Sequence, residues 1–484
     1  MSNIDSKLVA YSAPAELPRS HNFKVRVKTL EGDWVELVTY IVRVDMHDVR
    51  EAAMATFDFD GIVQVEIESS VHIEHAVIRP LSFQIPFAQE GNHKLRFTLH
   101  QAVKLSIEIN GERFHNLHLF ANALELESPD ASGANVLVVE PGSYETQVLH
   151  SLMEQREQAT DIIYLAPGLH RFNDGHFLIP SNTTVYIAGG AVVIGSFVCH
   201  HVENVVICGR GIVYLRDIEK TTYWRSVQID FSRNIVVKDI ISIDPPHYSI
   251  HLGQSGNVLI RNFKSFSTRG WCDGIDMMSC KNIRIEDVFL RTSDDCIAVY
   301  GSRGVFKGDT ANVIVKDSIL WADVAHPIMI GCHGDHEQNG DKLENLRFEN
   351  IDILEHHEPQ DGYWGCIAIN VGDKNTVRHA IFRNIRIEQF ELGRLFDIRV
   401  FHNVRYNPAP GERVEHIYFE DISFNGSCDN PSVIAGYDEQ RIVDGVHFHN
   451  LRINGQLIKS AQEGNFECNE FQRNVTFSGD ENLK

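Results

Sequence analysis

The sequence lacks long apolar runs, closely spaced cysteine pairs and an excess of basic side chains. No run of 18 apolar residues occurs among the 484 residues, so no membrane-spanning helix is predicted. The nine cysteines include no Cys-x-x-Cys pair, which indicates buried free thiols in a reducing compartment. Lys and Arg number 44 against 66 Asp and Glu, and the resulting net charge of −22 disfavours nucleic acid and anionic membranes as partners.

The N-terminal segment also lacks the apolar core of a signal peptide. Residues 1–20 contain Asp5, Glu16 and Pro18, which interrupt any such core. Together with the unpaired cysteines, this predicts a cytoplasmic protein. Removal of a leader peptide ahead of this sequence would instead make the protein a secreted one.

The N-terminal quarter of the sequence alternates apolar and polar residues. From Phe23 to about Leu126 the period is two, as in the segment Val63-Gln64-Val65-Glu66-Ile67. Short strands with one buried face predict a β-sandwich. Turn residues at 128–133 interrupt the pattern. We therefore predict an N-terminal β-sandwich domain over residues 1–132 and a second domain over residues 133–484.

After residue 180 the sequence repeats a short unit, an Asn followed by alternating aliphatic residues. The starts of six copies are separated by 30, 23, 25, 30 and 33 residues, and they are Asn204, Asn234, Asn257, Asn282, Asn312 and Asn345. Each copy holds two or three short strands, too few to bury their own inward face, so successive copies must stack. Stacked coils of short strands predict an all-β parallel β-helix. The blades of a β-propeller, the alternative, need about 40 to 50 residues each.

Three aspartates stand out from the repeats. Asp273 lies 21 and 22 residues before the adjacent pair Asp294 and Asp295, close to the length of one coil, so stacking can bring all three carboxyls together. Clustered carboxyls repel when ionised, so at least one keeps its proton. A protonated acid beside an ionised base is what hydrolysis of a glycosidic bond needs. The alternative is that the Asp-Asp pair only caps a turn.

Three motifs resemble glycoside hydrolase family 28, the polygalacturonases and their relatives. They are Asp273-Gly274-Ile275-Asp276, then Ser293-Asp294-Asp295-Cys296-Ile297-Ala298-Val299, and then His326 before Ile328-Met329-Ile330-Gly331. Family 49, the dextranases and isopullulanases, belongs to the same clan. The resemblance implies a right-handed parallel β-helix and an inverting mechanism. It also implies that Asp294 is the general acid, that Asp273 and Asp295 are the bases holding the attacking water, and that His326 supports the acid.

The resemblance breaks down at the segment that grips the substrate in polygalacturonases. Those enzymes carry Arg-Ile-Lys there, whereas the counterpart, residues 366–370, has neither cation. A galacturonate would lose its charge-assisted partners, so a neutral α-linked oligo- or polysaccharide is predicted, as for a dextranase or isopullulanase. Arg394 and Arg399 keep open a polygalacturonase-like exo-hydrolase of galacturonate-containing oligosaccharides. A β-helix polysaccharide lyase and a non-catalytic glycan-binding protein also stay open.

Further substrate contacts are expected around these motifs. Aromatic rings can stack on the apolar face of a sugar, and polar side chains nearby can bind its hydroxyls. The candidates for substrate binding are Trp271, Asp276, Tyr300, His333, Tyr363, Trp364, Asn370 and Arg399. His333 and His336 form a His-x-x-His pair, but without further spaced ligands it favours a sugar contact over a metal site. We expect a carbohydrate substrate, no metal and no cofactor, and leave the oligomeric state open.

Overall fold

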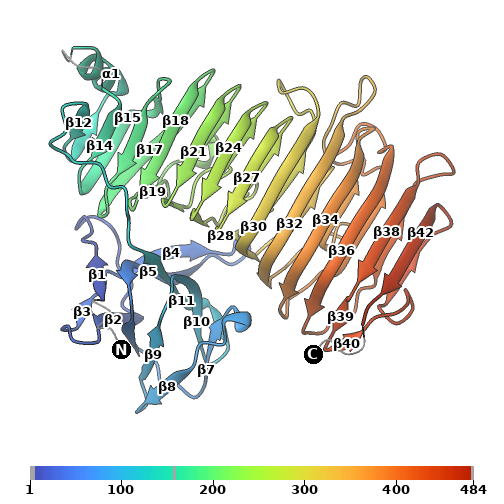
Figure 1. The fold of residues 1–484 in the computed structure, drawn as a ribbon, viewed down its shortest axis with the longest axis horizontal. Helices are drawn as coiled ribbons and strands as arrows, with labels where there is room; N and C mark the ends of the chain where they lie inside the picture. The colour runs from blue at the N-terminus through green and yellow to red at the C-terminus, as the bar shows by residue number, and fades with distance from the viewer. Residues whose placement is uncertain (1–5, 156–159, 481–484) are drawn as a thin grey trace.

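The computed structural model describes residues 6–155 and 160–480, and strands dominate both ranges. Within these ranges one α-helix occurs, α1 (Thr146–Glu154), with two single-turn 3-10 helices, η1 (Leu81–Phe83) and η2 (Lys220–Thr222). No helix in the described ranges has both the length and the apolarity to cross a bilayer. Figure 1 shows the blue N-terminal strands lying beneath one end of a long row of parallel strands.

The N-terminal strands form a sandwich of two sheets. The first has the order β1-β5-β11-β10-β7 with β4 added beside β5, and the second has the order β3-β2-β6-β9-β8. Their inward faces enclose one apolar core that includes Val25, Val65 and Leu105. The connection from β11 to β12 contains the expected domain boundary at Ser132. The strands are β1 (Lys7–Ala10), β2 (Phe23–Thr29), β3 (Val35–Glu36), β4 (Tyr40–Val44), β5 (Arg50–Asp60), β6 (Val63–Ser69), β7 (Ala76–Arg79), β8 (Phe87–Glu90), β9 (Lys94–Leu99), β10 (Val103–Ile109) and β11 (Glu112–Ala123).

The remaining strands coil into a right-handed parallel β-helix with three faces, as predicted. The first face contains β12 (Val136–Val139), β14 (Ile162–Leu165), β16 (Thr184–Ile187), β18 (Glu203–Gly209), β21 (Arg233–Lys238), β24 (Gly256–Arg261) and β27 (Lys281–Glu286), and it continues through the first parts of β30 (Thr310–Ala322), β32 (Lys342–Glu355), β34 (Thr376–Ile387) and β36 (Arg413–Phe424) to β38 (Val443–His449) and β42 (Gln472–Ser478).

The second face contains β13 (Gly142–Tyr144), the first parts of β15 (Gly168–Leu178) and β17 (Ala191–His200), β19 (Ile212–Tyr214), β22 (Ile241–Ile243), β25 (Lys264–Phe266) and β28 (Phe289–Thr292), then the later parts of β30, β32, β34 and β36, and β39 (Arg452–Ile453) with its hairpin partner β40 (Gln456–Leu457). The third face follows the later parts of β15 and β17 with β20 (Val227–Asp230), β23 (Ile250–Gly253), β26 (Ile275–Met278), β29 (Ile297–Tyr300), β31 (Ile328–Ile330), β33 (Gly365–Val371), β35 (Arg394–Val400), β37 (Ser432–Ala435) and β41 (Phe466–Cys468).

The repeated asparagines lie at one bend of each coil. Asn234, Asn257, Asn282 and Asn312 all have φ between 54° and 58°, a left-handed conformation that Asn tolerates better than most residues. Each side-chain amide donates to the Asn Oδ1 of the preceding coil, for example from Asn282 to Asn257 at 3.0 Å. One repeating residue type therefore supplies both the bend and a hydrogen bond between coils, which is why the repeat could be recognised in the sequence.

The sandwich packs against the second face of the β-helix. Phe114 and Phe120 of β11 join an apolar cluster with Phe266, Phe289 and Trp321 of β25, β28 and β30. The chain turns from this covered face to the third face immediately after those same strands. The N-terminal domain consequently lies beside the row of turns that carries the three motifs.

Candidate active site

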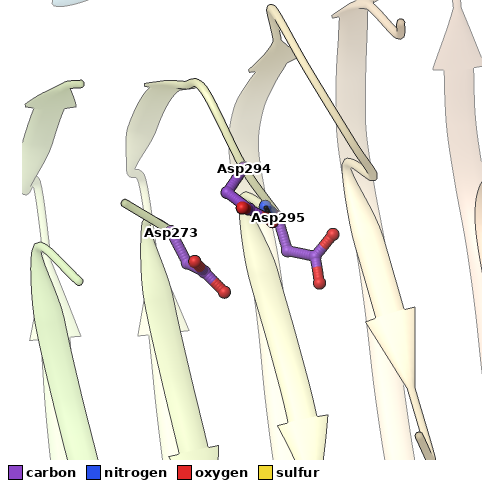
Figure 2. Close-up of side chains that lie close together, drawn as sticks. All are labelled: Asp273, Asp294 and Asp295. Atoms are coloured by element: carbon purple, nitrogen blue, oxygen red, sulfur yellow. Dashed lines mark hydrogen bonds between the residues drawn. The ribbon is translucent and has the colours of Figure 1, made fainter. Parts of the chain in front are cut away.

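Coil stacking brings the three aspartates together. Asp273 lies in the turn between β25 and β26, and Asp294 and Asp295 lie in the equivalent turn between β28 and β29, one coil further along (Figure 2). One carboxyl oxygen from each residue lies within 4.8 Å of the others. His326 occupies the same turn of the next coil, between β30 and β31. The residues that resemble the three motifs are therefore neighbours on one side of the β-helix.

The aspartates face a cavity of about 590 Å³, a size typical of ligand sites. Of the residues predicted to contact substrate or act in catalysis, those that line it are Trp271, Asp273, Asp294, Asp295, Tyr300, His333 and Tyr363. Trp271 is the most open of the aromatic ones, with 62% of its surface exposed. Three carboxyls and several aromatic rings thus share one open cavity, which is the composition expected of a sugar-binding site.

Asp295 is held as a carboxylate. Its Oδ1 accepts hydrogen bonds from the backbone N–H of His326 at 3.1 Å and from Nδ1 of His326 at 2.6 Å, and its Oδ2 accepts one from the Tyr300 hydroxyl at 3.2 Å. Nε2 of His326 donates to the carbonyl oxygen of Tyr363 at 2.7 Å. Because both ring nitrogens face acceptors, the ring is an imidazolium. Burial alone would lower the pKa of His326, but the Asp295 carboxylate raises it to about 9.

This pairing differs from the expectation that His326 supports the general acid, Asp294. The ring instead contacts the second aspartate of the pair, because adjacent residues at the turn direct their side chains apart (Figure 2). His326 is itself fully buried and does not line the cavity. It therefore acts on Asp295 by orienting the carboxylate and pairing with its charge.

Asp294 is arranged to keep a proton. Burial raises the pKa of Asp294 to about 7, and the charge of Asp295 adds to the rise. The backbone N–H groups of Trp271 and Asp295 donate to its two oxygens at 2.9 and 3.0 Å and limit the effect. An acid with a pKa near neutrality is suited to protonating a leaving oxygen.

We expect kcat/KM to fall as the pH rises through about 7. The donor must be protonated to act, so activity is retained below the raised pKa of Asp294 and lost above it. Because the neighbouring carboxyls titrate as a unit, the midpoint belongs to the cluster. A pH profile of kcat/KM on the free enzyme measures it. An alkaline limit below about pH 5, near the ordinary range of Asp, would contradict the assignment.

Asp273 differs from a simple ionised base. Burial first, and then the charges of Asp276, Asp294 and Asp295, raise the pKa of Asp273 well above its ordinary range. Burial likewise raises the pKa of Asp276 to about 8. Protonated forms of this pair are therefore favoured at neutral pH. Asp295 differs from both in its hydrogen bond to the His326 imidazolium.

Comparison with known proteins identifies the family. The model of the glycosyl hydrolases family 28 matches residues 209–467, more than half of the chain. The chain belongs to this family. This membership agrees with the resemblance of its three motifs.

Two curated relatives show how similar this chain is to known family 28 proteins. It is 26% identical over 266 residues to a polygalacturonase of Juniperus ashei, covering 52% of this chain and 49% of the relative. It is 22% identical over 232 residues to exopolygalacturonase B of Aspergillus niger, covering 44% and 49%. The chain thus spans about half the length of these relatives.

Among solved structures, Dex49A from Penicillium minioluteum superposes with a TM-score of 0.67 at 15% identity, covering 97% of this chain and 96% of that one. A family 28 exopolygalacturonase from Yersinia enterocolitica gives 0.51 at 10% identity, covering 91% and 99%. At these identities the two likenesses show a shared fold.

Four of the predicted substrate-binding residues do not line the cavity: Asp276, Trp364, Asn370 and Arg399. Asp276 and Asn370 are fully buried. The Asn370 amide donates to the carbonyl oxygen of Asp397 at 2.8 Å, and Arg399 forms an ion pair with the Asp397 carboxylate at 2.5 Å. Arg399 therefore already has an anionic partner, which weakens its case as a clamp for a substrate carboxylate.

Two cations of this cavity were not predicted from the sequence. Arg303 and Arg405, from the turns after β29 and β35, both line it. The cations considered from the sequence were Arg394 and Arg399, and neither of them lines the cavity. Tyr248, Glu358, Gln360 and Tyr406 also line the cavity and were not predicted. A charged residue shortly after the Asp-Asp motif was the available signal for Arg303.

Proposed function

We propose that this family 28 hydrolase cleaves α-linked oligosaccharides with inversion, using Asp294 as general acid and Asp295 as general base. Asp294 protonates the leaving oxygen, and Asp295 takes a proton from the attacking water. Asp273, on the coil before, orients that water by hydrogen bonding. The support is the hydrogen-bond pattern: Asp295 is paired with the His326 imidazolium, while burial raises the pKa of Asp294 to about 7.

We further propose a sugar carboxylate, as in galacturonate, as part of the substrate. Burial alone would lower the pKa of Arg303, but its neighbours, Tyr248 first, raise it above its ordinary value, so the group stays charged. Among the described residues no carboxylate forms an ion pair with this guanidinium, and the Tyr248 hydroxyl, at 2.9 Å, is its hydrogen-bonded side-chain partner. A half-buried cation without a carboxylate partner favours an anionic ligand.

This proposal replaces the neutral sugar predicted from the sequence. That prediction rested on the absence of the Arg-Ile-Lys cations, and the observation that carries the new proposal is Arg303 in the cavity. The two curated relatives, which are polygalacturonases, point in the same direction.

A substrate panel tests the proposal. Oligogalacturonates, dextran and pullulan are incubated with the full chain, and release of reducing ends is measured. Cleavage of oligogalacturonates alone supports an acidic substrate, and cleavage of dextran or pullulan alone refutes it. Ultraviolet absorbance is recorded in parallel, because a lyase would give unsaturated products.

The first product anomer is expected to have inverted configuration. The resemblance to family 28 is the reason to expect inversion. One carboxyl oxygen from each aspartate lies within 4.8 Å of the others, whereas the two carboxyls of typical inverting enzymes are roughly 6.5–9.5 Å apart, so the stereochemistry is measured directly. Proton NMR of the anomeric signals within the first minutes of reaction distinguishes the two courses. Retention of the anomeric configuration in the first-formed product would mean that a carboxylate acts as a nucleophile, and not as the general base proposed for Asp295.

A further inference from the structure

The N-terminal domain reaches the cavity of the active site. Met46 and His47, in the loop between β4 and β5, line the same cavity as the three aspartates. A Cβ built on Gly270, directly before Trp271, would lie 3.8 Å from the Met46 sulfur. The His47 ring lies 6.2 Å from the ring of His357, on the turn after β32. This loop therefore spans the turns of several coils along one edge of the cavity.

The loop is fixed to the segments that carry the catalytic residues. The backbone N–H of Asp45 donates to Oδ2 of Asp323 at 3.2 Å, and Asp323 forms a fully buried ion pair with Arg291 at 2.9 Å. Asp323 lies three residues before His326, and Arg291 lies three residues before Asp294. Asp45 also accepts a hydrogen bond from the backbone N–H of His47 at 2.9 Å, which closes the turn.

Further contacts of the domain interface support this edge. Arg79 of the sandwich pairs with Glu388 at 2.6 Å, and Asp58 pairs with Arg210 at 2.6 Å, both in buried surroundings. The two domains also share the apolar cluster that contains Phe120. A large apolar interface limits the relative motion of two domains, and ligand sites are common where domains meet.

We propose that Met46 and His47 form a sugar-binding subsite with Trp271, so that the N-terminal domain supplies one wall of the substrate cleft. This inference rests on the proposed function, because it takes an oligosaccharide as the ligand. His47 is exposed and Met46 half-buried, so both side chains are accessible. The exposed Trp271 ring offers an apolar face to a sugar ring, while the His47 imidazole can bond a hydroxyl or a carboxylate.

The subsite lies beside the reacting bond and not at it. Met46 and His47 contact neither the Asp294 nor the Asp295 carboxyl through any hydrogen bond of the described residues. Contacts made equally in the ground state and the transition state change KM and leave kcat unaltered. The two residues are therefore assigned to substrate specificity, with no part in proton transfer.

Full-length His47→Ala and Met46→Ala are compared with wild type on galacturonate oligomers of increasing length. We expect KM to rise about fivefold or more on the longer oligomers and less on the shortest cleaved one, with kcat unchanged. Val49→Ala is the matched control, because Val49 is 51% exposed in the same loop and lies outside the cavity. Equal KM values for wild type and both variants at every length would overturn the inference.

A binding measurement separates this inference from the proposed function. Calorimetry compares Asp294→Asn with the double variant Asp294→Asn/His47→Ala, using the same oligomers. Weaker binding by the double variant supports the subsite even if wild type turns over none of these oligomers, an outcome that would refute only the proposed function. Equal binding, or no binding by either variant, overturns the subsite.

Discussion

Replacing Asp294 with Asn is expected to lower kcat by about 10²- to 10⁴-fold, the usual contribution of a general acid. The amide keeps the size of the side chain and one acceptor oxygen for the N–H of Trp271 or Asp295, but it has no proton to transfer. Substrate binding should persist, because the aromatic and cationic walls of the cavity are unchanged. Initial rates and calorimetric affinity on the same oligosaccharide measure the two effects.

Stability provides the control for this variant. The pKa of Asp294 is raised in the folded protein to about 7, so its ionisation opposes folding as the pH rises above its ordinary value. Asp294→Asn should therefore melt at the same or a higher temperature than wild type at pH 8. The exposed Asp429→Asn should leave both rate and melting temperature unaltered. Full activity of Asp294→Asn would exclude Asp294 as the acid, whereas bound but uncleaved glycan in wild type would favour a glycan-binding protein.

The convergence of the three aspartates could be predicted because a parallel β-helix turns spacing along the chain into proximity. The interval from Asp273 to Asp294 is close to one coil, and in-register pairing of β26 with β29 sets the turns that precede these strands side by side. The asparagine repeat made that register visible. Because the backbone register alone brings these turns together, the proximity of the three aspartates could be predicted without knowing their side-chain conformations.

The hydrogen-bond partners and the walls of the cavity could not be predicted in the same way. His326 contacts Asp295 and not Asp294 because of the direction that each side chain takes at one turn. Arg303 lies in a turn after β29, outside the asparagine repeat that revealed the coils. The loop at Asp45 meets Asp323 across 278 residues, from another domain, so no periodicity connects the two. Contacts made by loops depend on how the domains pack, which no local pattern in this sequence encodes.

Replacing Arg303 with Gln is expected to lower kcat/KM on oligogalacturonates by about 10- to 100-fold. A hydrogen bond to a charged group contributes about 1.5–3 kcal/mol, and each 1.4 kcal/mol corresponds to about tenfold in affinity. Gln retains a donor for polar contacts but cannot pair with a carboxylate as a cation. The loss should follow the charge of the substrate, so kinetics on oligogalacturonates and on their methyl esters are measured side by side.

The ratio of the two substrates separates recognition from damage to the fold. Wild type should prefer the free acid, because Arg303 has no carboxylate partner among the described residues and the substrate would supply one. In Arg303→Gln that preference should disappear, whereas a variant that merely folds poorly would lose rate on both substrates equally. Arg347→Gln is the matched control, since this arginine lies on the first face with its side chain 46% exposed. An unchanged preference in Arg303→Gln would show that a different group, such as Arg405, binds the acid, and a wild type indifferent to esterification would remove the case for an acidic substrate.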